Sequence, residues 1–571
     1  MMGQFNRDQG QLFYCFNLEE VVPGDHLVRA IAAVLDLSWV RAELAPHYSP
    51  MGRPSIDPLL MIRMLIVGYV FAIRSERALC REVQVNLAYR WFCGLGIEDK
   101  IPDHSVFSRA RNERFGDHDI FRHVFERVVA ACIGAGLVGG EGFAVDASLI
   151  QADANKHRSI PGTEWNKNID PNHARRAVKE YLATLDDPAY GTASDVTPKF
   201  VSPSDPAAQW TGALRNAAFF AYADNYLIDA KFGIIMDVEA SRAIRQAEVG
   251  ASQTMIARTE AVFGIKPKWL AADTAYGSAA NLEWLVNEQG IAPHVPVIDK
   301  SQREDGTFSR EDFSYDEVRD VYTCPAGKTL TTTGHVSTDH ARRYLASVPE
   351  CRACPLKPKC CPNMPARRIV RDVNEAARDV ARALAKTEAF ARSRRERKKV
   401  EMLFAHLKRI LRLARLRLRG PSGAQFEFTL AAIAQNLKRL ANLCLAHHRS
   451  RPWCAWRKLW CVPSPQTPTL RPECTAKGSM RLRLKKLPHQ STRHQIRLLQ
   501  QYGPNDQTLF ARCEKFRRRA RSGLMHCSER RRNLIAVCEG LKTTGLTCLA
   551  PSADETPLTL VLLRGNLGRH G

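Results

Sequence analysis

Apolar residues recur at helical spacing over most of the first 138 residues. After Asp25, one helical face carries Leu27, Val28, Ile31, Val34 and Leu35. Asp57 followed by Pro58 is typical of a helix start, because the carboxylate accepts from free N–H groups and proline has none to satisfy. The pattern predicts a helical N-terminal domain over residues 1–138.

One of these predicted helices, around residues 104–115, carries several arginines. They are Arg109, Arg111 and Arg114. A helix of this kind in a small helical domain can enter a DNA groove. The same sequence also suits a packing helix with a solvated basic face, and both interpretations stay open.

At residue 139 the pattern changes to short apolar strands alternating with helices. The first strand, FAVDASLI, has Asp146 in its middle, and a later strand ends at Asp273. Between and after them the sequence predicts a hairpin (226–229 and 233–240), helices (248–263 and 278–288) and a strand (291–297). This alternation indicates an α+β domain with a mixed sheet.

The alternation is interrupted at residues 298–368, which contain a cysteine cluster, and helical spacing returns over 370–448. We therefore predict a catalytic domain at 139–450 with an insertion at 298–368. The longest apolar stretch, residues 64–73, is ten residues long. A membrane-spanning helix needs roughly 20, so we expect a buried helix and no membrane partner.

The net charge indicates which classes of partner the chain favours. The chain has 83 Lys and Arg against 59 Asp and Glu, a formal charge of +24. A field of this sign favours a polyanion such as nucleic acid, or an anionic membrane surface. Residues 451–571 hold 23 of the basic residues and only 7 acidic ones. This irregular basic tail is expected either to be a disordered nucleic-acid-binding arm or to derive from a shifted reading frame or fusion.

The cysteines indicate a reducing compartment. The chain has 17 of them and no apolar export signal at its start, which favours reduced thiols or metal ligands and a cytoplasmic location near the nucleoid. Cys324, Cys351, Cys354 and Cys360 form the pattern C-x26-C-x2-C-x5-C. This spacing allows a structural zinc site, and the alternative is a small insertion with reduced cysteines.

Three carboxylates are candidates for chemistry. Asp146 interrupts an apolar strand, where burial without a partner or metal would be costly. Asp273 follows a strand directly, at the end where α/β sheets bind ligands. Glu401 lies in a predicted helix, on the same face as Arg397 and Lys408. An exposed helix with paired charges would look similar when taken alone.

Together, the carboxylates suit two hard divalent cations with oxygen ligands. Two such ions roughly 3.5–4 Å apart activate an attacking oxygen and stabilise a leaving oxygen in phosphoryl transfer. The cationic side chains beside the glutamate would hold the phosphates on which those ions act.

At these residues the sequence resembles bacterial insertion-sequence transposases of the DDE class with an InsH-type N-terminal domain. The resemblance runs from about Phe16 to about His448. Its segments are GRPSIDPLLMIRMLIVGY, IPDHSVFSRARNERF, FAVDASLIQADANK, LAADTAYGSAANL and the R-x3-E-x6-K pattern of Arg397, Glu401 and Lys408. Related patterns often have tyrosine three residues before the arginine, where this chain has Arg394.

The resemblance implies an RNase H-like catalytic core with Asp146, Asp273 and Glu401 as catalytic ligands of Mg²⁺ or Mn²⁺. It also implies that Arg397 and Lys408 contact the DNA backbone. The expected partners are double-stranded DNA, as terminal inverted repeats and target, and a second copy in a homodimer.

The expected reaction is nicking at the element ends to expose 3′-hydroxyls, which then join target DNA. Two alternatives remain. One is a metal-dependent nuclease of the same fold without strand transfer, and the other is a catalytically inactive DNA-binding regulator derived from a transposase.

Overall fold

The computed structural model describes residues 17–448, except 49–50, 52–54, 112–114, 116–118, 166–168, 171, 188–189, 191–196, 213–216, 298–304 and 339. Beyond residue 448 it describes only four short strands: β14 (Arg471–Cys474), β15 (Met480–Arg483), β16 (Thr547–Cys548) and β17 (Leu562–Leu563). The chain divides into the units Met1–Val462 and Pro463–Gly571. The predictions on residues 451–571 lie largely outside the described residues.

The N-terminal region is helical, as predicted. Its elements are α1 (Leu18–Val21), α2 (Leu27–Val34), α3 (Val40–Leu44), η1 (Ala45–His47), α4 (Pro58–Val70), α5 (Glu76–Val85), α6 (Leu87–Cys93), α7 (Ser105–Ala110) and α8 (Ile120–Gly134). The start of α4 has the expected cap, because the Asp57 carboxylate accepts a hydrogen bond of 2.9 Å from the amide of Leu59 and Pro58 occupies the first turn. Most of α4 is buried, which explains its long apolar sequence.

The arginine-bearing helix α7 packs against the rest of the protein at its C-terminal end. The Arg111 side chain is 11% exposed and ion-paired with Glu76, and its guanidinium lies 4.9 Å from the centre of the Phe426 ring. Arg109 is exposed, and Arg114 lies outside the described residues. Arg111 therefore packs within the protein and does not belong to a solvated basic face.

The central sheet is mixed and has six strands. Its strands are β1 (Gly142–Gln151), β4 (Gln209–Thr211), β5 (Phe219–Asp229), β6 (Ile235–Arg242), β7 (Trp269–Ala271) and β8 (Ala292–His294). The order is β4-β5-β1-β7-β8, and β6 also pairs with β5. Strand β5 runs antiparallel to β1, whereas β7 lies parallel to both β1 and β8. The predicted hairpin is β5–β6, and the predicted mixed sheet is confirmed.

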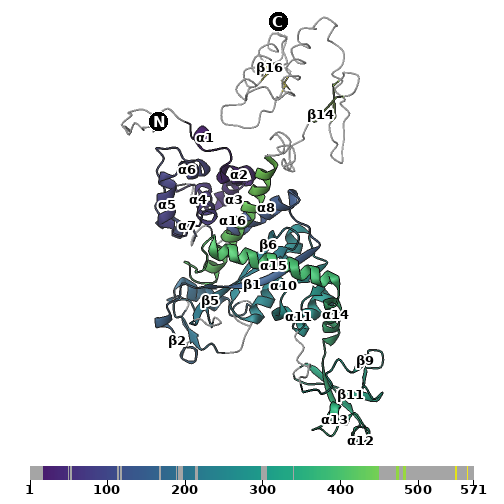
Figure 1. Ribbon diagram of the computed structural model, residues 1–571. Coiled ribbons are helices and arrows are strands. Elements are labelled where there is room, and N and C mark those ends of the chain that lie inside the picture. The colour runs from purple at the N-terminus through teal and green to yellow at the C-terminus, as the bar shows by residue number, and fades with distance from the viewer. Residues whose placement is uncertain are drawn as a thin grey trace, which may run out of the picture. The chain divides into compact units, whose positions relative to one another are not determined.

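Helices and short strands connect the strands of this sheet. They are η3 (Lys156–Arg158), β2 (Ile160–Pro161), η4 (Gly162–Glu164), α9 (Arg176–Ala183), β3 (Phe200–Val201), α10 (Arg245–Phe263), η5 (Thr274–Tyr276), α11 (Ala279–Glu283) and the π-helical turn η6 (Trp284–Glu288). Two long helices follow α14 (Glu375–Ala385), namely α15 (Glu388–Arg409) and α16 (Pro421–His448). Helix α15 contacts β1 and crosses the sheet (Figure 1), where Phe404 stacks on Tyr226 at 4.8 Å between ring centres.

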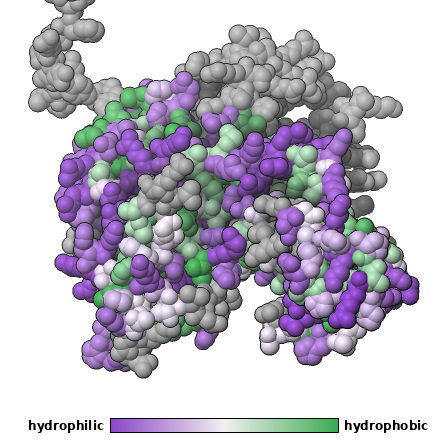
Figure 2. Space-filling model, turned by 60° about the horizontal axis from the view of Figure 1, so that its bottom comes forward, coloured by the Kyte–Doolittle hydropathy of each residue, from purple (hydrophilic) through white to green (hydrophobic). Residues whose placement is uncertain are grey.

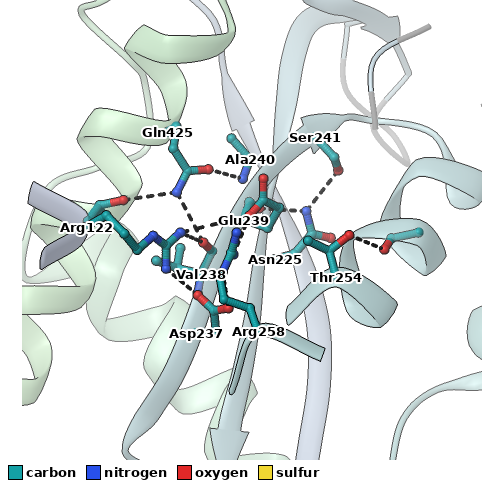
Figure 3. A network of polar contacts seen from close by, with 12 residues as sticks. Arg122, Asn225, Asp237, Val238, Glu239, Ala240, Ser241, Thr254, Arg258 and Gln425 are labelled. Atoms are coloured by element: carbon teal, nitrogen blue, oxygen red, sulfur yellow. Dashed lines mark hydrogen bonds and ion pairs between the residues drawn. The ribbon is translucent and has the colours of Figure 1, made fainter. Parts of the chain in front are cut away.

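Helix α16 covers the outer edge of β6 with side-chain amides. Asn436 accepts a hydrogen bond of 3.0 Å from the amide of Ile235 and donates one of 2.8 Å to the Ile235 carbonyl. Gln425 binds Ala240 N–H and the Val238 carbonyl in the same way (Figure 3). These contacts replace the missing strand, so the edge cannot pair with another chain.

The same helix also contacts the N-terminal helices α2, α4 and α8. A polar network reinforces this junction, because Arg122 of α8 bonds to Asp237 and to the Val238 carbonyl of β6 (Figure 3). Arg258 of α10 reaches the same Asp237 at 2.7 Å. The helical region and the sheet therefore share one continuous hydrophobic core.

The insertion has its own sheet and its own small core. Its elements are β9 (Ser314–Asp316), β10 (Val321–Thr323), β11 (Thr329–Val336), β12 (Ala341–Ala346), α12 (Val348–Arg352), α13 (Lys357–Cys360) and β13 (Arg368–Asp372), with strand order β13-β12-β11-β10-β9. The buried members of its core are Phe313, Tyr322, Leu330, Tyr344, Cys360, Cys361 and Ile369.

None of the described helices is long and apolar enough to cross a membrane. The apolar segment at residues 64–73 lies largely within the buried helix α4, as expected. The face drawn in Figure 2 is mainly hydrophilic, with its apolar residues in separate patches.

Candidate active site

The central sheet and α15 bring the three predicted carboxylates to one place. Asp146 lies within β1, and Asp273 follows β7, the parallel neighbour of β1. The last β1–β7 pair joins Ala144 to Ala271, so each aspartate stands two residues beyond it. Glu401 comes from α15, which crosses β1 (Figure 1). The convergence of these three elements brings Asp273 and Glu401 within electrostatic range of Asp146.

Arg397 connects two of the carboxylates directly. One guanidinium nitrogen lies 3.0 Å from Asp146 Oδ2, and the other lies 3.0 Å from Glu401 Oε1. Arg397 and Glu401 are one helical turn apart, and the Arg397 side chain is 20% exposed. A delocalised cation therefore sits between the largely buried Asp146 and the exposed Glu401 and compensates the charge of both.

Asp146 is the most constrained of the three. Its side chain is 18% exposed, and burial raises its pKa to about 6, with Asp273 and Glu401 adding to the rise. The hydrogen bond from Ala147 N–H and the charge of Arg397 act in the opposite direction. Asp273 accepts a hydrogen bond of 2.8 Å from Ala275 N–H, which fixes it at the start of η5.

Two residues near this cluster were not predicted from the sequence. Glu248, in the first turn of α10, has its pKa raised to about 7 by burial and then by Asp273 and Asp146. Tyr276, at the end of η5, is 1% exposed, and its hydroxyl interacts electrostatically with Glu248, Asp146 and Asp273. A carboxylate in the first turn of a helix is common because of the helix dipole, so sequence alone gave no reason to single out Glu248.

A cavity of about 550 Å³ opens beside Asp273 and Arg397. Its cationic lining residues are Arg382, Lys386, Arg394 and Arg397. Arg394 is the residue that stands where related patterns have tyrosine. The cavity, which Glu311 also lines, therefore places Asp273 beside a mainly basic surface that suits an anionic substrate.

Lys408 lies further along α15 and faces a different acidic residue. It is half-buried, and burial lowers its pKa while the charge of Asp224 acts in the opposite direction. Asp224 is fully buried, and it pairs in register with Ser148, two residues from Asp146 on β1. Lys408 and Glu401 thus belong to one helix above the same strand, but they have different partners.

The cysteines of the insertion are only partly brought together. The thiols of Cys351, Cys360 and Cys361 interact with one another, and the Cys324 sulfur accepts a hydrogen bond of 3.3 Å from Lys328 N–H. No group of three or more His, Cys, Asp or Glu among the described residues is arranged to hold a metal ion. Zinc binding by Cys324, Cys351, Cys354 and Cys360 stays a prediction, which the zinc content of the purified protein would test.

The carboxylates around Asp146 are likewise not arranged as a metal-holding group among the described residues. The position of Arg397 gives a physical reason. Its guanidinium stands between Asp146 and Glu401 and takes the place that a cation between them would need. The donors nevertheless fit Mg²⁺ or Mn²⁺, since carboxylate oxygens are the ligands that these ions prefer. Asp273 and Glu401 add to the rise in the pKa of Asp146 because the carboxylates repel one another. A divalent ion bound among them would relieve that repulsion.

Two family models match the chain. A model described as "Transposase domain (DUF772)" matches residues 16–113, and one described as "Transposase DDE domain" matches residues 323–441. The second match includes Glu401, Arg397 and Lys408 but neither aspartate. A helical transposase domain followed by a DDE domain defines a DNA transposase. Each match covers less than half of the chain, and together they support an insertion-sequence transposase of the DDE class.

Comparison with other proteins adds little to these matches. The curated proteins contain no significant match to the chain. A cryo-EM structure of a piggyBac transposase synaptic complex with hairpin DNA is 8% identical, covers 76% of this chain and 83% of that chain, and has a TM-score of 0.27. A similarity at this level carries no argument about the fold or the site.

Proposed function

We propose that Asp146, Asp273 and Glu401 form the catalytic centre and bind Mg²⁺ or Mn²⁺. The observation that carries this proposal is their origin from β1, from the end of the parallel strand β7 and from α15, with Arg397 joining two of them. The order β5-β1-β7-β8, with only β5 antiparallel, supports an RNase H-like core. When bound, the divalent ions would polarise the scissile phosphate and stabilise the departing oxygen.

Arg397 would have two partners in turn. Without a cation, its guanidinium neutralises Asp146 and Glu401. With that charge supplied by a bound cation, Arg397 would be free to hold a phosphate in the cavity that it already lines. Arg394 and Lys386 line the same cavity and would extend the contact along the DNA backbone. Lys408 would add a backbone contact further along α15.

The full reaction would be hydrolytic nicking at terminal inverted repeats, followed by attack of the exposed 3′-hydroxyl on target DNA. Two copies of the chain, one at each end of the element, would form a homodimer in the DNA complex. The N-terminal helices would bind the repeats, with Arg109 of α7 exposed for this purpose. Arg111 would not take part, because it is held by Glu76 and Phe426.

The test is a reaction of purified protein with end DNA, target plasmid and Mg²⁺. Joined product supports the transposase, cut product alone supports a nuclease without strand transfer, and binding alone supports an inactive regulator. Asp146→Asn, Asp273→Asn and Glu401→Gln should each abolish cleavage while end binding persists. Double variants should be little worse than single ones, because residues that act as a unit give non-additive losses. Near-normal cleavage by any single variant would remove that residue from the centre.

A further inference from the structure

Glu248 lies close to the carboxylate cluster because several elements hold α10 against it. Helix α10 begins directly after β6 and contacts η5, the turn that follows Asp273. Gln253 of α10 donates a hydrogen bond of 3.1 Å to Asn281, and Asn281 donates one of 2.9 Å to the carbonyl of Tyr276. The middle of α10 and the turn after Asp273 are therefore linked through side chains, which hold the helix that carries Glu248 against this turn.

The Tyr276 hydroxyl provides an independent observation at the same place. The residue is 1% exposed, and among the described residues the hydroxyl has no hydrogen-bond partner. Its largest electrostatic interaction is with Glu248, followed by Asp146 and Asp273. Buried hydroxyls are normally hydrogen-bonded, so the Tyr276 hydroxyl is available to donate to an acceptor in this part of the site.

Charge gives a second reason to expect a cation here. Burial and the neighbouring Asp273 and Asp146 raise the pKa of Glu248 to about 7. Arg397 compensates Asp146 and Glu401, but it makes no ion pair with Glu248 or Asp273. The charge of Arg245 opposes the rise in the pKa of Glu248, but among the described residues no ion pair on the Asp273 side corresponds to the one between Arg397 and Glu401.

We propose that Glu248 is a fourth carboxylate of the centre and supplies an oxygen ligand to a divalent ion bound beside Asp273. The Tyr276 hydroxyl would donate a hydrogen bond to the Glu248 carboxylate in that state. This inference rests on the proposed metal-dependent function and extends it. A simple helix-dipole role for Glu248 would affect stability and leave metal affinity unchanged. Metal binding therefore separates the two roles.

The experiment measures Mn²⁺ binding to the full chain by the electron paramagnetic resonance signal of free Mn²⁺, without DNA or turnover. Glu248→Gln should weaken binding of one ion by about ten- to hundredfold, the range seen when metal-site neighbours are removed. Tyr276→Phe, which keeps the ring, should weaken it by a smaller factor. Glu260→Gln, on the same helix but paired with Lys266, is the matched control and should bind as wild type.

Asp146→Asn separates failure of this inference from failure of the proposed function. If Asp146→Asn loses Mn²⁺ while folded Glu248→Gln and Tyr276→Phe bind it as wild type does, the centre stands and the role of Glu248 is overturned. If Asp146→Asn also binds Mn²⁺ normally, the proposed function itself fails. Circular dichroism establishes folding, and should Glu248→Gln not fold, wild-type affinity in Tyr276→Phe would by itself overturn the proposal.

Discussion

Replacing Asp146 with asparagine should stabilise the metal-free protein. The aspartate is 18% exposed and lies in the buried strand β1, where an ionised group pays a desolvation cost that Arg397 only partly offsets. Asparagine has nearly the same shape, and its oxygen can still accept the hydrogen bond from Ala147 N–H. The substitution removes the buried charge while keeping the packing.

The size of this effect follows from the pKa of Asp146. It is raised to about 6 from an ordinary value of 3.8, a difference worth about 3 kcal/mol at about 1.4 kcal/mol per unit. Between these two values the folded chain keeps a proton that the unfolded chain has released. The contribution of Asp146 to stability is therefore lost as pH rises from about 4 to about 6 and stays lost above it.

Urea unfolding of wild type and Asp146→Asn at pH 4.5 and pH 7.5, without divalent ions, measures this difference. The variant should gain up to about 3 kcal/mol over wild type at pH 7.5 and much less at pH 4.5. Added Mn²⁺ should then stabilise the wild type and leave the variant unchanged.

A variant less stable than wild type at pH 7.5 would refute this reasoning, since Asp146 would then contribute more through its ion pair with Arg397 than it costs by burial. An equal gain at both pH values would also refute it, because the effect would not arise from ionisation.

Three further predictions concern α15 and α16. Arg397→Gln should lower metal-free stability at pH 7.5, and Mn²⁺ should stabilise it more than wild type because the ion replaces a lost cation; an equal Mn²⁺ response in urea unfolding would contradict this. Lys408→Met should reduce the salt dependence of end binding by about one unit of slope. An unchanged slope with lower stability would leave Lys408 as the partner of Asp224. Asn436→Ala should cost about 2–4 kcal/mol, because it leaves a buried N–H and C=O of Ile235 unpaired; a loss below about 1 kcal/mol in urea unfolding would show that water replaces the amide.

Local patterns were enough to predict much of the fold and the elements that carry the three carboxylates. The strand around Asp146, the strand before Asp273 and the helix of Glu401 each have a clear hydrophobic period, and the structure contains all three elements. Spacing along one helix also placed Arg397 beside Glu401, which their contact at 3.0 Å bears out.

Contacts made between distant segments could not be predicted in this way. The carboxylate facing Lys408 comes from Asp224, which the β5–β1 register places beneath α15. Glu248 joins the cluster only because α10 packs against the turn after Asp273. Neither residue has a sequence signal of its own, since a strand aspartate and a first-turn glutamate each have common structural roles.

The position of α16 in the sequence has a consequence for synthesis of the protein. The N-terminal helices end with α8 at Gly134, yet α16, which packs on α2, α4 and α8, begins only at Pro421. At about 5–20 residues per second, the ribosome needs on the order of 15 to 60 s to make the intervening chain. During that time the apolar faces of the early helices lack their final cover. We expect nascent chains halted before Pro421 to be chaperone substrates, and chains that include α16 to become protease-resistant.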